Sequence, residues 1–258
     1  MPPSRRPASH APPNEVRAAP IEPPLVALEG RLICNSVDQA ALASELLAEH
    51  VPLSRAEPGN LRFDLWQQSD PLVWHLSELY ADDAAFQAHR QRLRASRWGR
   101  ESHGIQRDFI RSTPLPMIRS PQARDAAGIE RLLGRNPSRT TSSAAAPAHG
   151  PAAHALLVEA AGVIIAFLMM THQRTPAPAL VVAALCVHAA LRGRGLGTAL
   201  LRAALQDVQG HTVLASGPRR WLERMGFSHT APREHAGQAM MMNLPEHRHQ
   251  LRPAPRSG

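Results

Sequence analysis

The sequence predicts an α+β protein with two folded domains between two terminal tails. Its 258 residues suffice for one large domain or two ordinary ones, each able to bury a core. Stretches in which apolar residues alternate, as in strands, are mixed along the chain with stretches in which they recur at helical spacing. The prolines of "TPLPMIR", residues 113–119, divide this pattern in two, as a linker does. We therefore place the domains at residues 25–113 and 114–245, with proline- and arginine-rich tails at 1–24 and 246–258 that bury too little surface to order themselves.

The first domain is predicted to run strand, helix, strand, strand, helix, strand. Its strands are expected in "PLVALEGRLIC", "NLRFDLW", "LVWHLSELY" and "QRDFIRST". Its helices are expected in "SVDQAALASELLAEHV", which opens on Ser36 or Asp38 as a cap, and in "DDAAFQAHRQRLRAS".

The second domain is predicted to open with a strand and a helix in "MIRSPQARDAAGIERLL". Two strands joined at Ala161 and Gly162 follow in "HALLVEAAGVIIAFLMM", after a low-complexity segment at 136–154. The remaining elements are the strand "ALVVAALCV", a glycine loop, the helix "LGTALLRAALQDV", the strand "TVLAS", the short helix "PRRWLERMG" and the strand "AMMMNL".

Composition excludes several classes of function. A net charge of +8 would suit a nucleic-acid binder, but all 29 basic residues are arginine, and the abundant alanine and proline indicate coding bias rather than a phosphate-tracking surface. Cys34 and Cys186 lie far apart in apolar segments, without the spacing of a metal or redox pair. No apolar run reaches the roughly 18 residues of a membrane span, and residues 1–20 lack the apolar centre of a signal peptide. We expect a cytoplasmic protein with no metal, nucleic-acid or membrane partner.

The most informative stretch is "LRGRGLGTALL", residues 191–201, between a predicted strand and a predicted helix. It lacks the Gly-Lys-Ser/Thr of a Walker loop, and Thr198 stands where a dinucleotide fingerprint needs glycine. What remains is Arg192-x-x-Gly195-x-Gly197. Glycines leave room for successive backbone N–H groups to face one anion at the positive end of a helix. The loop is therefore predicted to hold a diphosphate without a metal.

With its flanks, this region resembles the GNAT acetyltransferase superfamily, whose signature Q/R-x-x-G-x-G/A binds the pyrophosphate of acetyl-CoA. The blocks "LCVHAALRGRGLGTALL" and "RRWLERMGF" carry the resemblance, which covers roughly residues 115–245. It implies a mixed-sheet α/β domain in which "ALVVAALCV" and "TVLAS" splay apart around the pantetheine arm. It also implies that the backbone of Cys186 and Val187 pairs with that arm. The diphosphate would be held by the Thr198 hydroxyl and by the N–H groups of Arg192, Gly193, Arg194, Gly195, Leu196 and Gly197.

Chemistry in that superfamily is direct attack of an amine on the thioester, with a base for the amine and an acid for the departing thiolate. Here the usual tyrosine acid falls on Leu222, and a carboxylate often found in the preceding strand falls on Ala183. His188 is our candidate base, with a solvated strand-end residue as the alternative. Ser216 is our candidate for contacting the pantetheine or the departing sulfur.

The first domain resembles the antibiotic biosynthesis monooxygenase (ABM) family, through "SRAEPGNLRFDL", "LSELYADDAAFQAH" and "ASRWG…RDF". The resemblance implies a ferredoxin-like domain of the dimeric α+β barrel type, which forms homodimers through its sheet. Because Ala85 and His89 are four apart on one helix, we expect His89 to face a cavity between helix and sheet. Trp66, His75, Glu78 and Trp98 are predicted to line the same cavity. The alternative for His89 is a core histidine whose partner is a neighbour such as Glu78.

We interpret the chain as an ABM-like domain fused to an acetyl-CoA-dependent N-acetyltransferase, whose acceptor is a small-molecule or protein amine. One alternative is a cofactor-independent monooxygenase of quinols or aromatic compounds whose acetyltransferase half is degenerate. Another is a non-catalytic sensor of acetyl-CoA and an aromatic ligand. Leucine and alanine at the usual acid and base positions, 222 and 183, favour this sensor.

Overall fold

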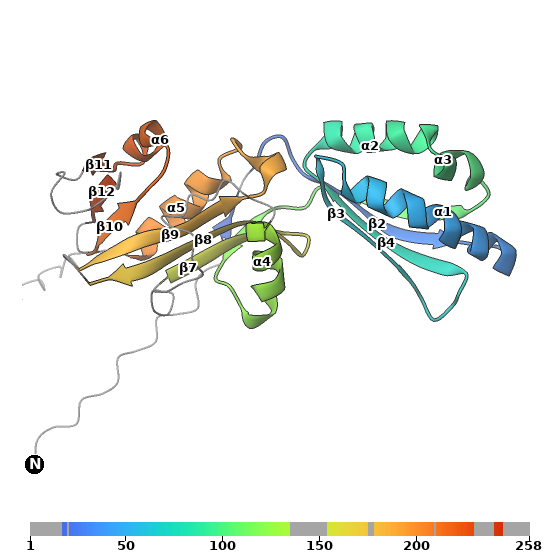
Figure 1. The fold of residues 1–258 in the computed structure, drawn as a ribbon, viewed down its shortest axis with the longest axis horizontal. Coiled ribbons are helices and arrows are strands. Elements are labelled where there is room, and N and C mark those ends of the chain that lie inside the picture. Colours follow the sequence, from blue (N-terminus) through green and yellow to red (C-terminus); the bar gives the residue numbers. More distant parts are fainter. Residues whose placement is uncertain are drawn as a thin grey trace, which may run out of the picture.

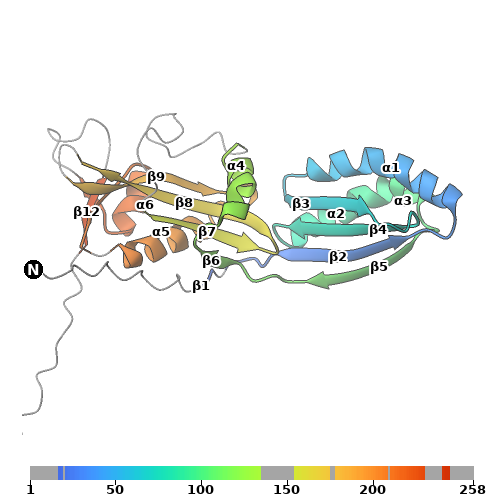
Figure 2. The same cartoon turned by 90° about the horizontal axis from the view of Figure 1, so that it is seen from below.

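The computed structural model describes residues 17–19, 21–134, 154–174, 178–208, 210–229 and 240–244. Two α+β units lie end to end in it (Figures 1 and 2). The low-complexity segment and the C-terminal tail predicted from the sequence lie outside the described residues, apart from His154.

The first unit is a four-stranded sheet with helices on one face, as Figure 2 shows. Its strands are β2 (Val26–Ile33), β3 (Asn60–Gln67), β4 (Val73–Tyr80) and β5 (Gln106–Ser112). They are ordered β3-β4-β2-β5, and every neighbouring pair is antiparallel. The helices are α1 (Val37–Arg55), α2 (Asp83–Ala95) and α3 (Arg97–Glu101). The sequence predicted all of these elements except the short α3.

Both long helices of this unit begin at polar caps. Ser36 accepts a hydrogen bond from the backbone N–H of Gln39 at 3.2 Å, so the serine is the cap of α1. Asp82 does the same for α2 through the N–H of Ala85 at 2.8 Å. The Asp82 cap fixes where the helix that carries His89 begins.

The second unit is an eight-stranded sheet in the order β1-β6-β7-β8-β9-β10-β12-β11. Its strands are β1 (Arg17–Ala18), β6 (Met117–Arg119), β7 (His154–Ala160), β8 (Val163–Gln173), β9 (Ala179–Val187), β10 (Thr212–Ala215), β11 (Ser228–His229) and β12 (Met240–Asn243). Its helical elements are η1 (Ala123–Asp125), α4 (Ala126–Gly134), η2 (Ala189–Leu191), α5 (Leu196–Asp207) and α6 (Arg219–Arg224).

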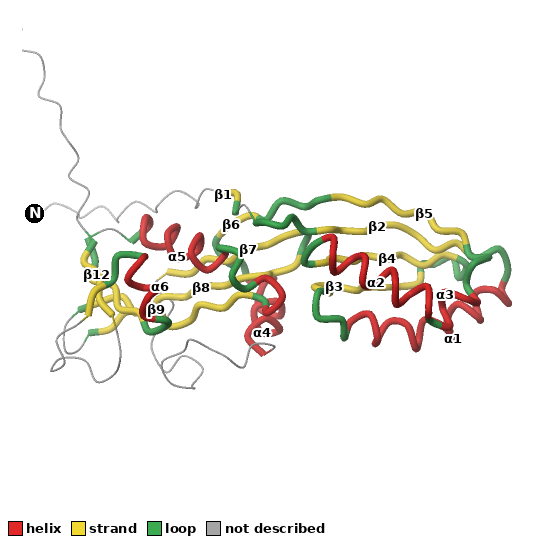
Figure 3. Tube along the Cα trace, turned by 90° about the horizontal axis from the view of Figure 1, so that it is seen from above, coloured by secondary structure: helices red, strands yellow, loops and turns green. Residues whose placement is uncertain are grey.

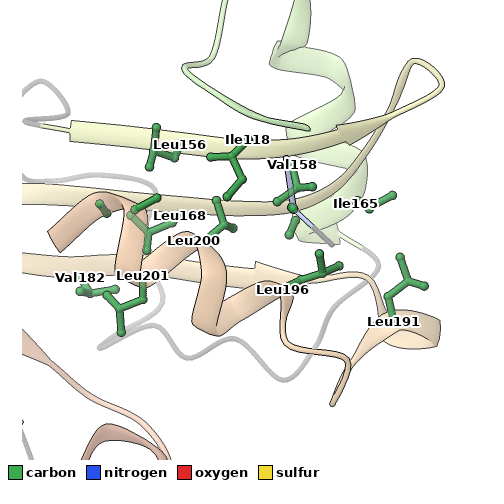
Figure 4. Packing of buried hydrophobic residues seen from close by; sticks show 14 of the residues in the cluster. Ile118, Leu156, Val158, Ile165, Leu168, Val182, Leu191, Leu196, Leu200 and Leu201 are labelled. Atoms are coloured by element: carbon green, nitrogen blue, oxygen red, sulfur yellow. The ribbon is translucent and has the colours of Figure 1, made fainter. Parts of the chain in front are cut away.

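Helices α4 and α5 pack on opposite faces of this sheet. Side chains alternate between the two faces along each strand, so neighbouring residues of one strand contact different helices. On β7, Leu157 packs with Leu132 of α4, whereas Leu156 and Val158 belong to the cluster that includes Leu200 of α5. Figure 4 shows side chains of that second cluster between α5 and the strands. Each such fully buried leucine contributes about 1.5–3 kcal/mol.

The predicted N-terminal tail differs from the structure. Arg17–Ala18 forms β1 and pairs with β6 at the sheet edge, as Figure 3 shows. Ala19 is fully buried and Ile21 is 6% exposed, both within the core of the second unit. Residues 1–24 are rich in proline and arginine as a whole, and this composition predicted a tail although the segment contains these few apolar residues. The folded chain therefore starts before residue 25.

The two units share an apolar junction. Ala27 and Leu79 lie on the face of the first sheet away from its helices, and they belong to the same buried cluster as Ile165 and Leu191 of the second unit. Arg62 of β3 donates to the backbone oxygen of Ala161 in the β7–β8 turn. The strand ends of one unit thus abut the sheet of the other.

Candidate functional site

The glycine loop has a backbone that only glycine adopts readily. Gly193 and Gly195 have φ angles of 79° and 88°, in the left-handed region. No atom lies within 4 Å of a Cβ built on either residue, so conformation rather than crowding requires glycine there. Gly195 caps α5, and the N–H groups that follow it lie at the positive end of this 12-residue helix. The geometry is that of an anion cradle.

Beside this loop, β9 and β10 pair over only two positions. Leu180 and Val181 of β9 match Val213 and Leu214 of β10, and the pairing is parallel. From Val182 to Val187, β9 has no described strand on that side. This open edge leads directly to the glycine loop and includes Cys186 and Val187, the two residues to which the GNAT resemblance pointed.

The side chains of the loop have different surroundings. Arg194 turns toward the first unit, where its guanidinium pairs with Asp82 at 2.5 Å and donates to the Ala81 oxygen at 2.7 Å. Its contribution to a bound anion is therefore restricted to its backbone. The Thr198 hydroxyl accepts a hydrogen bond from the indole of Trp221 at 3.0 Å, which orients the hydroxyl at the start of α5.

The two candidate acid–base residues flank the open edge of β9. Nδ1 of His188 accepts from the N–H of Ala190 at 3.4 Å, so in the neutral ring the proton lies on Nε2. Ser216 is half-buried immediately after β10. Leu222 is 1% exposed in the core, where it supplies packing and no proton.

The first unit contains a partly open apolar cavity of about 360 Å³ between its helices and its sheet. Glu78, His89 and Trp98 line it, as predicted. Trp66 and His75 do not, which corrects our prediction: they are paired residues on the opposite face of the sheet, where their rings stack 5.3 Å apart. Glu78 is three residues from His75 on the same strand, and alternation therefore places the two on different faces.

A hydrogen-bonded network surrounds His89, which is 2% exposed. Its Nδ1 lies 2.9 Å from Oε2 of Glu57, and Glu57 also accepts from Arg92. The partner of His89 is thus Glu57, not the Glu78 we had considered. Burial opposes ionisation of Glu57, but the hydrogen bonds from His89 and Arg92 prevail and lower the pKa of its carboxyl.

The Glu78 carboxyl lies in apolar surroundings and is 3% exposed. Burial raises its pKa from 4.5 to about 7, although the Tyr80 hydroxyl donates to it at 2.8 Å. His50, unremarked in the sequence, lines the same cavity, and burial lowers its pKa to about 4. The lining of the cavity thus includes one carboxyl group with a pKa near 7 and two buried imidazole rings.

Comparison with protein families decides what the two units are. The antibiotic biosynthesis monooxygenase model matches residues 37–100, and the model of the acetyltransferase (GNAT) family matches residues 125–227. The chain joins an ABM domain to a GNAT domain. The matched ranges fall within the first and second units described above.

Solved structures resemble each domain separately. Rv0793 from Mycobacterium tuberculosis is 22% identical over 38% of this chain and 98% of its own, with a TM-score of 0.31. PA3566 from Pseudomonas aeruginosa is 22% identical over 37% of this chain and 97% of its own, with a TM-score of 0.30. A GNAT family acetyltransferase from Brucella melitensis, crystallised with acetyl-CoA, is 17% identical over 51% of this chain and 92% of its own, with a TM-score of 0.39. The comparison with curated proteins gave no match.

The described residues contain no helix long and apolar enough to span a membrane. The same residues contain no group of three or more histidine, cysteine or acidic side chains that could hold a metal ion.

Proposed function

We propose that the GNAT domain transfers the acetyl group of acetyl-CoA to an amine. The observation that carries this proposal is the combination of the open edge of β9 with a left-handed glycine loop at the start of α5. An extended pantetheine arm needs unpaired backbone along its length, and a diphosphate needs converging N–H groups. The unpaired strand edge and the glycine loop lie next to each other here, in the domain that the GNAT family model matches.

In this proposal the backbone of Cys186 and Val187 pairs with the pantetheine amides. The N–H groups from Arg192 to Gly197 and the Thr198 hydroxyl hold the diphosphate. Acetyl-CoA supplies the thioester that is cleaved. The amine nitrogen bonds to the acetyl carbon, the carbon–sulfur bond breaks, and the amine loses one proton while the thiolate gains one.

The proton acceptor and donor are proposed to be His188 and Ser216. The lone pair on Nδ1 of His188 already accepts from Ala190, so His188 acts as a base only when that 3.4 Å hydrogen bond yields. Loss of a positioned acid or base costs about 10²-fold or more in rate. We therefore expect His188→Ala and Ser216→Ala each to lower kcat, and His188→Ala to leave the affinity for acetyl-CoA unchanged.

Two measurements on the full chain test the proposal. Calorimetric titration with acetyl-CoA reports binding, and release of free thiol with a panel of small amines and lysine peptides reports transfer. We expect binding, and turnover with at least one amine. Absence of binding would contradict the proposal. Binding without turnover would favour the sensor instead, and the enzymatic assignment would then be withdrawn.

A second function is favoured by the cavity of the ABM domain. Its apolar lining, together with buried Glu78 and His89, suits an aromatic substrate from which a proton is removed. We propose oxidation of a quinol or related phenol by O₂ there. Consumption of O₂ with a panel of quinols, abolished by Glu78→Gln, is the expected result. No consumption above the rate of autoxidation would refute it.

We further propose that the chain forms a homodimer through the uncovered face of the ABM sheet. Trp66 and Ile110 are exposed on that face by 50% and 73%. The ion pair of Arg31 with Asp108 lies on the same face. Apolar side chains exposed among satisfied charges are typical of a surface that a partner covers.

A further inference from the structure

A larger cleft, of about 800 Å³, lies where the two domains meet. One wall comes from the ABM domain, where residues 60–64 of β3 and Arg55 at the end of α1 line it. The other comes from the GNAT domain, where α4, the β7–β8 turn and His188 line it. Figures 1 and 2 both place α4 and β3 on the two sides of this junction. The cleft is separate from the apolar cavity of the ABM domain, because Phe63 alone lines both.

The lining of the cleft carries an excess of positive charge. Five arginines and three carboxylates line it, and a fourth carboxylate, Glu29, pairs with Arg62 from outside the lining, so one positive charge is left uncompensated. Two of those carboxylates, Asp125 and Glu159, are both engaged by Arg119. The hydrogen bonds from Arg119 lower the pKa of Asp125 to about 2, so this group stays ionised and paired. The remaining arginines therefore set the charge that a ligand meets.

Guanidinium donors remain open on both walls. Arg124 and Arg131 stand seven residues apart on the η1–α4 segment, so they share a face. Neither guanidinium forms a hydrogen bond or ion pair with another described residue, although the charge of Arg124 contributes to the lowered pKa of neighbouring Asp125. On the opposite wall, Nε of Arg62 is buried without a hydrogen-bond partner. The other Arg62 nitrogens bind Glu29 and the Ala161 oxygen, which holds that side chain in place at the domain junction.

Arg55 completes the ABM wall. Its Nε donates to the Phe63 oxygen at 2.9 Å, while its nearest carboxylate, Asp64, lies 3.8 Å away, beyond hydrogen-bond reach. Nε thus positions the guanidinium, while Nη2 forms a long, exposed ion pair with Asp64 and keeps its hydrogen-bond donors for a ligand. Arg124 and Arg131 line the GNAT wall of the same cleft.

We propose that this interdomain cleft binds a small organic acid with at least two acid groups, carboxylates or phosphates, one held by each wall. The volume lies within the range of small-molecule sites. Guanidinium groups bind carboxylate and phosphate through paired, charge-assisted hydrogen bonds. A ligand so held joins the ABM domain to the GNAT domain and lies next to His188, which lines the same cleft. The site does not depend on acetyl-CoA binding or on acetyl transfer.

The test is calorimetric titration of the full chain with citrate and, separately, with pyrophosphate as probes. We expect saturable binding of at least one, and the comparison between them shows whether the site favours carboxylate or phosphate. The double variant Arg124→Gln/Arg131→Gln and, from the other wall, Arg55→Gln should each weaken binding tenfold or more, since each removes charge-assisted hydrogen bonds. Arg202→Gln is the matched control, because Arg202 is exposed on α5 outside the cleft, and it should leave the affinity unchanged.

A second control separates the cleft from the glycine loop, which also binds anions in our proposal. Gly195→Val alters that loop, so any pyrophosphate that binds the loop should be lost, while citrate and the pyrophosphate held in the cleft should still bind. The proposal is overturned by any of three results. These are no binding of either probe to the unmodified chain, equal weakening by Arg202→Gln, or loss of all probe binding in Gly195→Val with retention in the arginine double variant.

Discussion

Replacing Gly195 by valine probes the coenzyme loop most sharply. Gly195 has φ 88° and ψ −12°, a conformation that costs an L-residue about 1–2 kcal/mol and a β-branched one more. No atom lies within 4 Å of the added Cβ, so the core has no steric reason to unfold. We expect the chain to relieve the strain by turning the peptide groups on either side of residue 195. Their N–H groups then no longer face the diphosphate.

The expected loss of affinity follows from those hydrogen bonds. A hydrogen bond to a charged group is worth about 1.5–3 kcal/mol, and losing two at the lower value removes about 3 kcal/mol. That corresponds to about a 100-fold weaker binding of acetyl-CoA. Calorimetric titration measures the affinity, and thermal denaturation by circular dichroism checks that the variant is folded.

Gly197→Ala is the matched control. Gly197 is helical, and a Cβ there would lie 3.7 Å from Val187, an ordinary contact. The superfamily signature also accepts alanine at this position. We expect its affinity to stay close to that of the unmodified chain. A folded Gly195→Val variant that binds acetyl-CoA as tightly as Gly197→Ala would refute our reading of the loop.

Three further predictions concern the rest of the molecule. Arg194→Ala should destabilise the chain by about 2 kcal/mol in urea denaturation, because it leaves the half-buried Asp82 without its guanidinium, yet acetyl-CoA affinity should hardly change; a large loss of affinity would contradict this. In the folded chain Glu78 has a pKa of about 7, above its ordinary 4.5. Its ionisation therefore leaves the free energy of unfolding unchanged below pH 4.5 and lowers that free energy progressively as the pH rises to 7. This difference corresponds to about 3 kcal/mol, and Glu78→Gln should remove that pH dependence in denaturation curves; an unchanged slope would show that the carboxyl titrates normally. Trp66→Ser together with Ile110→Ser should convert a dimer to a monomer in sedimentation, and a monomeric unmodified chain would refute the proposed interface.

Features local in sequence were predictable. Periodicity located the long helices and strands, and Ser36 was already one of two candidate caps for the first of them. The glycine loop was recognisable because Gly193 and Gly195 stand at fixed positions between a strand and a helix. Because side chains alternate between the two faces of a sheet, Phe63 and Trp66, three residues apart on one strand, lie on opposite faces. This rule would have excluded Trp66 from the cavity on the sequence alone.

Features that depend on distant contacts were not predictable. Glu57 follows α1 in what reads as an ordinary turn, and only the fold brings it to His89, 32 residues later. The pairing of Arg194 with Asp82 joins residues 112 positions apart in different domains. The cleft between the domains is likewise invisible in either half alone, since its two walls meet only after both domains have packed together.

Hydrogen–deuterium exchange of the full chain with and without acetyl-CoA tests the central claim most directly. The unpaired edge of β9, from Val182 to Val187, and the loop from Arg192 to Thr198 supply the N–H groups that we assign to the coenzyme. We predict that acetyl-CoA slows exchange in these two segments and leaves β3 of the ABM domain unchanged. Unchanged exchange in both segments at saturating acetyl-CoA, or protection confined to the ABM domain, would contradict the assignment.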